Sequence, residues 1–508
     1  MKQNIKQNIK LRPENSYYVG NNGFVIKKEH FTEDELKKIK KDLTMVPKVI
    51  PGYGNDNPES FNIYGENANK LYLPKFYGFS NLGVPKKNKL RAGTEIDIKF
   101  NSSLRPIQEP IVEAYLNTIK DKDISGGIIC AGCGVGKTIM AIYLASVLKK
   151  KTIILVHKEF LMNQWKERIQ QFTPDARIGI IQGPKYDIGN KDIVIGMIQS
   201  ISNKDYPPFV FEDFGFLIAD ECHHLGAKTF CKSLRKVPVA YTLGLSATPN
   251  RKDGLSNVFK YYLGDIVYKT QKEKDSNILV DIYEYHYKDE SYGKQLLNYQ
   301  NRPNNAGMIN QIANCEKRNL FIVDLVKKHY QDDRKILILT ERLSQVAYLY
   351  EAIENLQYPV GKYCGGMKQV QLDKSLEMDI LVGTYTMIEE GFDCPKLNTL
   401  IMATPKSSIE QSVGRILRKK PSERTVSPLI IDLVDMFSTY SNKGLVRRKY
   451  YKKNNYSVSL SEVKQLQENV AINVVFERKK EKSDNNNSDD NEETSYGKHK
   501  KKQIEYSF

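Results

Sequence analysis

Eight consecutive residues near the first quarter of the chain combine three glycines with a lysine and a hydroxyl side chain. They are Ala131-Gly132-Cys133-Gly134-Val135-Gly136-Lys137-Thr138. Glycines at this density let successive backbone N–H groups turn inward around phosphate oxygens. Lys137 has the reach to contact β- and γ-phosphates, and Thr138 offers a hydroxyl of the kind that holds Mg²⁺. The segment, with its three glycines as further nucleotide contacts, therefore indicates a Walker A loop for ATP or GTP.

An acidic pair, Asp220 and Glu221, stands directly after the apolar run Phe216–Ala219. Such a pair at the end of a buried strand, downstream of a phosphate loop, indicates a Walker B site. Asp220 would hold Mg²⁺ through its hydration shell, and Glu221 would orient and deprotonate the attacking water. His223 and His224 follow, but the surrounding sequence lacks the Cys and His spacing of a zinc site, so we expect no zinc there.

The apolar residues indicate which elements hold these groups. The phosphate loop lies between an apolar run at 128–130 and a helix-like stretch at 138–148, which is the strand–loop–helix order that the motif needs. Other continuous apolar runs are typical of strands buried on both faces of a parallel sheet. These runs are 152–156, 192–198, 216–219, 335–339, 379–384, 397–403 and 429–433, with a helix expected at 343–355. Two α/β domains in tandem are the simplest arrangement.

The composition predicts several hydrophobic cores and a polyanionic partner. The chain has 508 residues, 40% of them hydrophobic, and a net charge of +17, which favours nucleic acid. Seven scattered cysteines indicate a reducing compartment. The polar N-terminus and the absence of an apolar run of membrane-spanning length predict a soluble intracellular protein without a membrane partner.

Composition also divides the chain into five expected segments. They are an N-terminal accessory domain at 1–100, an ATP-binding α/β domain at 101–268, a second α/β domain at 269–440, a basic extension at 441–482 and a tail at 483–508. The tail is rich in Asn, Asp, Glu and Ser and then in Lys, which is typical of disorder. For the basic extension, a solvated surface and a nucleic-acid contact remain equally open.

Two further segments resemble a known family. Asp220-Glu221-Cys222-His223-His224 and the later Ser246-Ala247-Thr248-Pro249 are similar to motifs of superfamily two helicases of the DExH type, within the DEAD/DEAH box group. The pattern Ser246–Gly254 resembles the XPB-like branch, which includes phage recombination helicases and the poxvirus-type transcript-release helicases of large DNA viruses. Relatives carry Arg-Glu-Asp where this chain has Arg251-Lys252-Asp253, so any role of that Glu does not transfer. The resemblance implies two RecA-like domains that use ATP and Mg²⁺.

The resemblance assigns roles to residues outside these first motifs. Gln108, in Leu104-Arg105-Pro106-Ile107-Gln108, is expected to contact adenine, although Ile107 replaces the usual aromatic residue. Segments 153–165 and 195–200 resemble motifs that touch the backbone of the tracking strand. Gly391 and Asp393 are expected near the ribose and the domain interface. Trp165, the only tryptophan, we assign to core packing.

A last motif supplies two arginines. The segment Gln411–Arg418 matches the family pattern Q-x-x-G-R-x-x-R. Arg415 and Arg418 stand four and seven residues after Gln411, a spacing that predicts all three side chains on one face of a helix. The resemblance implies that this face points across a cleft at the γ-phosphate, where guanidinium groups neutralise the charge of the transition state.

We therefore predict an ATP-dependent DNA helicase or translocase that moves 3′ to 5′ as a monomer in viral transcription, recombination or repair. Transcription or repair proteins are possible partners, and the expected location is the host cytoplasm or the virion, or the nucleus if the source is not viral. Alternatives are an RNA or DNA–RNA hybrid helicase and an ATPase-dead nucleic-acid-binding module, which the complete set of motifs disfavours. A restriction-type translocase subunit would need a nuclease partner.

Overall fold

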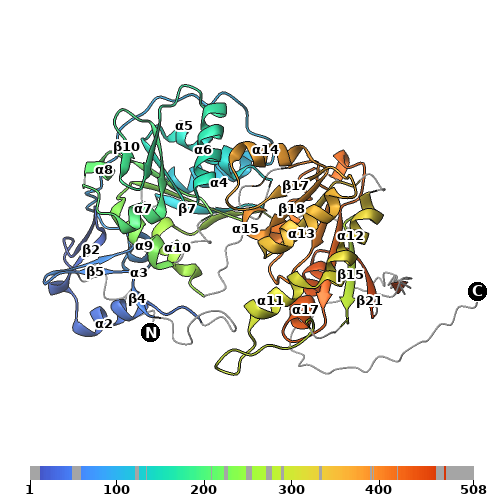
Figure 1. Cartoon of the computed structure of the whole chain (residues 1–508). Coiled ribbons are helices and arrows are strands. Elements are labelled where there is room, and N and C mark those ends of the chain that lie inside the picture. The colour runs from blue at the N-terminus through green and yellow to red at the C-terminus, as the bar shows by residue number, and fades with distance from the viewer. Residues whose placement is uncertain are drawn as a thin grey trace, which may run out of the picture.

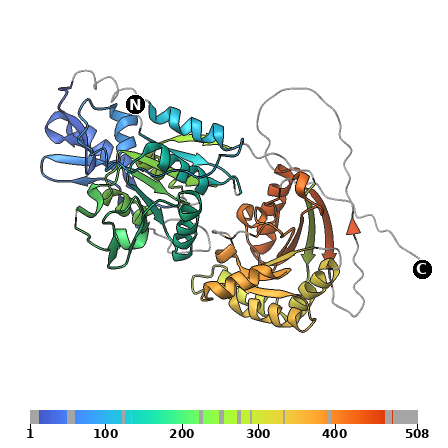
Figure 2. The ribbon, with the colours of Figure 1, turned by 90° about the horizontal axis from the view of Figure 1, so that it is seen from above.

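The computed structural model places two sheet-based lobes side by side, with the N-terminal segment on the outer side of the first lobe (Figure 1, Figure 2). The residues described are 12–48, 59–120, 125–132, 134–207, 209–221, 227–247, 254–270, 277–287, 291–330, 334–388, 392, 394–419, 421–464 and 474–475. Gly391, Asp393, the histidine pair and the expected tail at 483–508 lie outside these residues.

The first lobe is a sheet of eight strands in the order β10-β9-β11-β8-β12-β13-β7-β14. In chain order these are β7 (Gly126–Cys130), β8 (Thr152–Val156), β9 (Ile178–Gln182), β10 (Lys185–Asp187), β11 (Ile193–Met197), β12 (Phe216–Ala219), β13 (Tyr241–Ser246) and β14 (Ile266–Lys269). All neighbours are parallel except the β9–β10 pair. The expected parallel sheet is therefore confirmed, and β8 and β12 have the bounds that their apolar runs predict.

Helices cover both faces of this sheet, which explains why its strands are apolar throughout. Alternate strand residues pack on one side against α4 (Glu109–Lys120), α5 (Lys137–Leu148) and α6 (Glu159–Phe172). The other strand residues pack against α7 (Ile198–Asn203), α8 (Phe209–Glu212), α9 (Ala227–Lys236) and α10 (Ser256–Leu263). The carboxyl ends of the strands remain available for loops.

The second lobe repeats this plan with the order β17-β18-β16-β19-β20-β15-β21-β22. Its strands are β15 (Leu279–Tyr285), β16 (Ile336–Thr340), β17 (Val360–Tyr363), β18 (Ile380–Thr384), β19 (Thr399–Met402), β20 (Leu429–Asp435), β21 (Ser457–Val463) and β22 (Val474–Val475). Its helices are α11 (Asn305–Asn314), α12 (Glu316–Tyr330), α13 (Leu343–Glu354), α14 (Gln369–Glu377), α15 (Tyr385–Ile388), α16 (Glu410–Val413) and α17 (Tyr440–Lys453). The runs near 335, 379, 397 and 429 are confirmed as strands. β21, from the expected basic extension, pairs in parallel with β15 and is part of this sheet.

Two buried ion pairs hold the end of β20. The Arg318 guanidinium on α12 bonds Asp435 at 2.7 and 3.0 Å, and both side chains are fully buried. Arg447 on α17 bonds both oxygens of Asp432 at 2.9 Å. Each arginine also reaches a backbone carbonyl of the segment after β19, Arg318 that of Ala403 and Arg447 that of Lys406 at 2.7 Å. This segment leads directly into α16.

The N-terminal segment forms a sheet of order β1-β2-β6-β5 that packs on the first lobe. Its elements are β1 (Tyr17–Gly20), β2 (Gly23–Lys27), η2 (Lys28–His30), α2 (Glu33–Asp42), β3 (Thr44–Met45), β4 (Phe61–Asn62), β5 (Gly65–Glu66), β6 (Lys70–Leu73) and α3 (Lys75–Leu82). Its core continues into Cys231 of α9 and Val258 of α10. The Tyr262 hydroxyl donates to the Ile63 carbonyl at 2.9 Å. The segment is thus fixed to the helices on one face of the first sheet.

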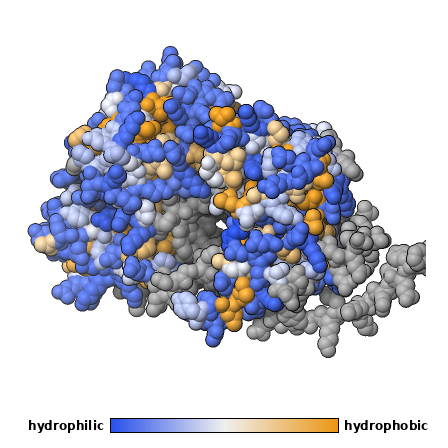
Figure 3. Space-filling view, viewed as in Figure 1, coloured by the Kyte–Doolittle hydropathy of each residue, from blue (hydrophilic) through white to orange (hydrophobic). Residues whose placement is uncertain are grey.

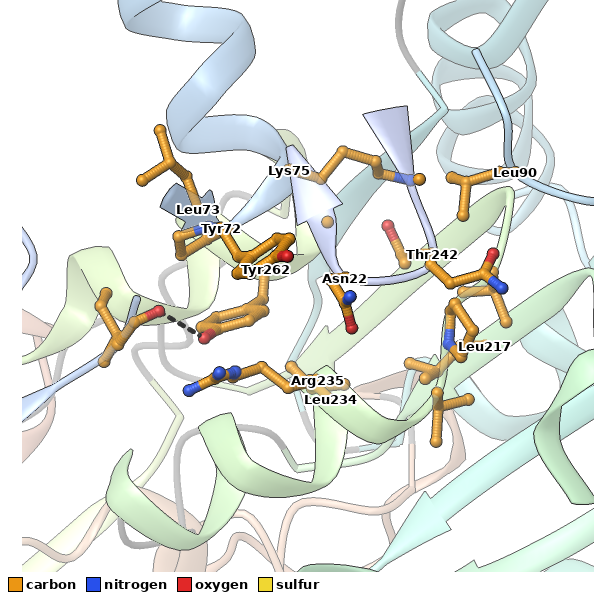
Figure 4. A pocket seen from close by; sticks show the side chains of 18 residues that line it. Asn22, Tyr72, Leu73, Lys75, Leu90, Leu217, Leu234, Arg235, Thr242 and Tyr262 are labelled. Carbon is orange, nitrogen blue, oxygen red and sulfur yellow. Dashed lines mark hydrogen bonds between the residues drawn. The ribbon is translucent and has the colours of Figure 1, made fainter. Parts of the chain in front are cut away.

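A cavity of about 60 Å³ lies at this junction, lined by Asn22, Tyr72, Lys75, Arg235 and Thr242 among others (Figure 4). Lys75 is buried, and its ammonium donates to the Ser125 hydroxyl at 3.1 Å and the Ala240 carbonyl at 2.9 Å. These are neutral acceptors, and burial lowers the pKa of Lys75 to about 7. The cavity lies away from the phosphate loop.

The lowered pKa of Lys75 predicts a pH-dependent stability. The folded protein releases this proton near pH 7, whereas the unfolded chain keeps it up to the ordinary pKa of 10.5. Between these values the unfolded state binds more protons, so stability should rise with pH, by up to about 1.4 kcal/mol per unit. Urea unfolding at pH 7 and pH 9 should show this rise in the wild type and lose it in Lys75→Met. The exposed Lys87→Met variant is the control; an unchanged rise in Lys75→Met would refute the assignment.

The face seen in Figure 3 is mostly hydrophilic, with hydrophobic residues in small scattered groups. Among the residues that the structure describes, no helix combines the length and apolar character needed to cross a membrane.

Candidate nucleotide site

The acidic pair and the phosphate loop lie at the same edge of the first sheet. β13 lies between β12 and β7, and all three strands are parallel. The residues after β7 and the residues after β12 therefore leave the sheet at the same carboxyl edge, where ligands bind in open α/β sheets. The loop after β7 enters α5 at Lys137, and Asp220 follows β12. This geometry explains how motifs more than eighty residues apart form one site.

The phosphate loop has a backbone that only glycine adopts easily. Gly134 and Gly136 have φ angles of 82° and 90°, in the left-handed region. A Cβ on Gly136 would lie 2.3 Å from Gln108 Nε2, so a side chain there would displace Gln108 from its contact with the loop. α5 begins without a side-chain cap, which leaves its first N–H groups facing the loop. Thr138 lies half-buried in this first turn. The arrangement fits a phosphate group.

Side chains from other segments hold the outer side of the loop. Gln108 is buried, and its Nε2 donates to the Val135 carbonyl at 2.8 Å while its Oε1 accepts from the Arg105 N–H at 2.9 Å. Arg105 Nη2 donates to the Gly134 carbonyl at 3.0 Å. The Thr270 hydroxyl accepts from the Gly132 N–H at 3.2 Å. Gln108 thus connects to the phosphate loop, and its contact with adenine stays a prediction.

Lys137 and Glu221 face each other across the site. Lys137 Nζ lies 3.6 Å from Glu221 Oε1 and donates to the Ala131 carbonyl at 3.1 Å. Both side chains are largely buried, at 11% and 17% exposure. Glu221 has a φ of 44°, a strained value for a residue other than glycine, and such strain is concentrated at functional sites. The ammonium and the carboxylate are therefore close enough to act on one bound phosphate and its attacking water.

Asp220 is a buried carboxylate with both oxygens oriented. Oδ1 accepts from the Glu221 N–H at 2.9 Å, and Oδ2 accepts from the Trp165 indole Nε1 at 2.8 Å. Burial, and then the neighbouring Glu221 carboxylate, raise the pKa of Asp220 to about 6. A cation nearby would offset this penalty on the charged form. The donor set of Asp220 and Thr138 beside a phosphate loop consists of oxygens, which fits Mg²⁺.

The two arginines of the second lobe converge on one acceptor. Arg415 Nη1 donates to the Phe392 carbonyl at 2.7 Å, and Arg418 Nη2 donates to the same oxygen at 3.2 Å. A Cβ built on Gly134 would lie 3.5 Å from Arg418 Nη1, so this guanidinium lies against the phosphate loop of the other lobe. Lys158 Nζ, after β8, donates to the Thr386 carbonyl of the second lobe at 3.3 Å. The two lobes therefore contact each other at the candidate site.

The prediction that Gln411, Arg415 and Arg418 lie on one face of a helix is wrong. α16 contains Gln411 but ends at Val413, with Gly414 as its cap, so Arg415 and Arg418 lie beyond the helix. After Gly414 the backbone makes only shorter-range bonds, from the Arg415 N–H to the Ser412 carbonyl and from the Ile416 N–H to the Val413 carbonyl. The two guanidinium groups bond the Phe392 carbonyl, an acceptor that the local sequence does not reveal. Arg418 nonetheless lies beside the phosphate loop, although it does so from beyond the end of α16. Gln411 is half-buried, while Gly391 and Asp393 lie outside the described residues.

Three contributors to the site were not identified in the sequence. Arg105 and Thr270 hold the phosphate loop, and Trp165 bonds Asp220 in addition to its expected core packing. Arg105 stands in the same short motif as Gln108, and this position in the sequence could have indicated a contact with the phosphate loop. Nothing in the sequence around Thr270 indicated its contact, because that contact depends on β14 pairing with β7.

Comparisons with known proteins add relatives to this geometry. The family described as "Type III restriction enzyme, res subunit" matches residues 101–251. The chain is 36% identical over 449 residues to a protein named as a putative ATP-dependent RNA helicase of Acanthamoeba polyphaga mimivirus, covering 86% of this chain and 85% of the relative. A transcript termination protein of Yaba monkey tumor virus is 25% identical over 410 residues, which is 73% of this chain and 83% of that protein. The crystal structure of T4 UvsW covers 85% of this chain and 96% of that chain at 20% identity, with a TM-score of 0.34.

Proposed function

Since the chain belongs to the superfamily two DExH helicases of large DNA viruses and is an ATP-dependent nucleic-acid helicase, we propose that it tracks along DNA, from 3′ to 5′, in viral transcription, recombination or repair. The XPB-like pattern at Ser246–Gly254 supports DNA. The name of the Yaba monkey tumor virus relative supports a setting in transcription.

The observation that supports ATP-driven movement is the position of Arg418 against Gly134. It brings a second-lobe guanidinium to the loop that would hold the β- and γ-phosphates. Lys137 and the first turn of α5 would bind those phosphates, and Glu221 would orient the attacking water. Mg²⁺, held by Thr138 and Asp220, would neutralise phosphate charge. Arg415 and Arg418 would stabilise the charge that develops as the γ-phosphoryl group transfers.

Movement follows from a site shared by two lobes. A nucleotide that contacts Lys137 on one lobe and Arg418 on the other stabilises the closed arrangement, and loss of the γ-phosphate removes part of that bridge. The strands β8 and β11, which belong to the segments 153–165 and 195–200, end at the same carboxyl edge of the first sheet. The residues of these segments at that edge would contact the backbone of the tracking strand. Because phosphate contacts carry little sequence information, we expect weak sequence preference and strong salt dependence.

ATP hydrolysis on a panel of nucleic acids tests the substrate. Single-stranded DNA, duplex DNA, RNA and a DNA–RNA hybrid of one sequence and length are compared by phosphate release, with Glu221→Gln as the blank. We expect DNA to stimulate hydrolysis, and less so at higher salt. Displacement of strands from 3′- and 5′-tailed duplexes then tests direction. Stimulation by RNA but not by DNA would refute the DNA assignment.

RNA is the second candidate substrate. The 36% identical mimivirus relative is named as an RNA helicase, and its alignment covers most of both chains. The same panel separates the two candidates, because both use the same ATP site and differ only in which polymer accelerates it.

A further inference from the structure

Trp165 occupies a position that core packing alone does not explain. It lies on α6 with only 1% of its surface exposed, among the side chains that pack α4, α5 and α6 on the first sheet. Its indole N–H points at a single acceptor, Asp220 Oδ2, at 2.8 Å. A phenylalanine would supply nearly the same packing area without a donor. The choice of tryptophan therefore adds a hydrogen bond to a buried carboxylate.

That hydrogen bond fixes the orientation of Asp220. The Glu221 N–H holds Oδ1, and the Trp165 indole holds Oδ2, so the donors come from the adjacent residue and from a helix on the face of the sheet. Each carboxylate oxygen has two lone-pair directions, and the bonds within the described part of the chain use one on each, which leaves the other for a further partner. A carboxylate with both oxygens held cannot rotate freely when a cation or its water approaches.

We propose that Trp165 is a positioning residue that sets the Asp220 carboxylate for Mg²⁺ at the nucleotide site. This inference rests on the proposed use of Asp220 as the Mg²⁺ residue. Groups that orient metal ligands typically contribute about 10- to 100-fold to metal affinity or activity. The effect should appear in Mg²⁺ dependence rather than in binding of the nucleotide itself, since Trp165 lies behind Asp220 and not in the phosphate loop.

Calorimetric titration of ADP, with and without Mg²⁺, tests this role. In the wild type, Mg²⁺ should tighten ADP binding. In Trp165→Phe we expect the gain from Mg²⁺ to fall by about tenfold, with Mg²⁺-free affinity unchanged. Ile169→Val, which trims another buried residue one turn along α6, is the packing control and should retain the full gain. A lower melting temperature in Trp165→Phe with the Mg²⁺ gain intact would overturn the proposal and leave a packing role.

A double-mutant cycle separates this inference from the proposed function. If Trp165 acts through Asp220, Trp165→Phe should cause no further loss of the Mg²⁺ gain in an Asp220→Asn background. If Trp165→Phe reduces the Mg²⁺ gain as much in the Asp220→Asn background as in the wild type, the inference is overturned. If Asp220→Asn alone leaves the Mg²⁺ gain unchanged, the assignment of Asp220 fails instead, and the positioning role fails with it.

Intrinsic fluorescence gives an answer even if Trp165→Phe does not fold. Because Trp165 is the only tryptophan, its emission reports the surroundings of one bond. Addition of Mg²⁺ to the ADP-loaded wild type should change this emission, and Asp220→Asn should abolish the change. An unaltered spectrum in the wild type under conditions where calorimetry detects Mg²⁺ would overturn the proposal.

Discussion

Replacement of Arg418 by alanine is expected to lower kcat for ATP hydrolysis by about a thousandfold or more, with a much smaller change in ATP affinity. Arg418 lies against Gly134 of the phosphate loop but belongs to the other lobe. Its guanidinium would act mainly on charge that develops in the transition state, whereas Lys137 and the start of α5 supply the ground-state binding. Phosphate release and nucleotide titration on the same variant separate the two quantities.

Neighbouring Lys419 provides the matched control. It is exposed and one residue further along the chain, so Lys419→Ala removes a positive charge from the same segment. We expect nearly wild-type hydrolysis. Arg418→Lys should remain strongly impaired, because an ammonium lacks the planar fork of a guanidinium. A loss in Arg418→Ala that appears wholly in ATP affinity would contradict a transition-state role.

The largest effect on stability is expected for Arg447→Ala. Arg447 is 1% exposed and Asp432 is fully buried, and the Tyr451 hydroxyl donates to the same carboxylate at 2.9 Å. Removal of the guanidinium leaves a buried carboxylate without its cation, which costs about 3–5 kcal/mol. That is a large part of the roughly 5–15 kcal/mol that stabilises a typical domain. The urea midpoint of the second lobe measures it.

Arg448 is the control on the same helix. It pairs with Glu284, but its side chain is 32% exposed, so Arg448→Ala should cost at most about 1 kcal/mol. The double variant Arg447→Met with Asp432→Asn should lose less stability than the sum of the losses of the two single variants, because it leaves no unpaired charge buried. Similar costs for Arg447→Ala and Arg448→Ala would show that burial of the Arg447 pair has no special weight.

The sequence predicted the strands well because buried parallel strands are continuous apolar runs with polar ends. Thr152–Val156 and Phe216–Ala219 have the predicted bounds, and Leu429–Asp435 extends its predicted run by two residues. Asp435 explains that extension, since it is polar yet buried by its ion pair with Arg318. Its inclusion in the strand depends on an arginine of a distant helix, which a pattern of apolar residues does not reveal.

The nucleotide-binding motifs were also evident in the sequence, but the residues that hold them in place were not. Lys137, Asp220 and Glu221 are recognised from their motifs, because the chemistry requires those groups after buried strands that end at the same edge of the sheet. Trp165 looked like a core residue because its indole N–H finds Asp220 only after α6 packs on β12. Arg415 and Arg418 were placed on a helix by their spacing, whereas the tertiary acceptor at Phe392 overrides that local preference.

The paired lobes are expected to form a working ATP hydrolase that nucleic acid stimulates. The steady-state rate of phosphate release by the wild-type chain and by Glu221→Gln, each with and without DNA, measures this. Glu221→Gln keeps the size of the side chain beside Lys137 and removes the carboxylate that would orient water. We expect DNA-stimulated release by the wild type and only background release by Glu221→Gln. A wild-type rate no higher than that of Glu221→Gln would contradict it and favour a nucleic-acid-binding module without catalysis.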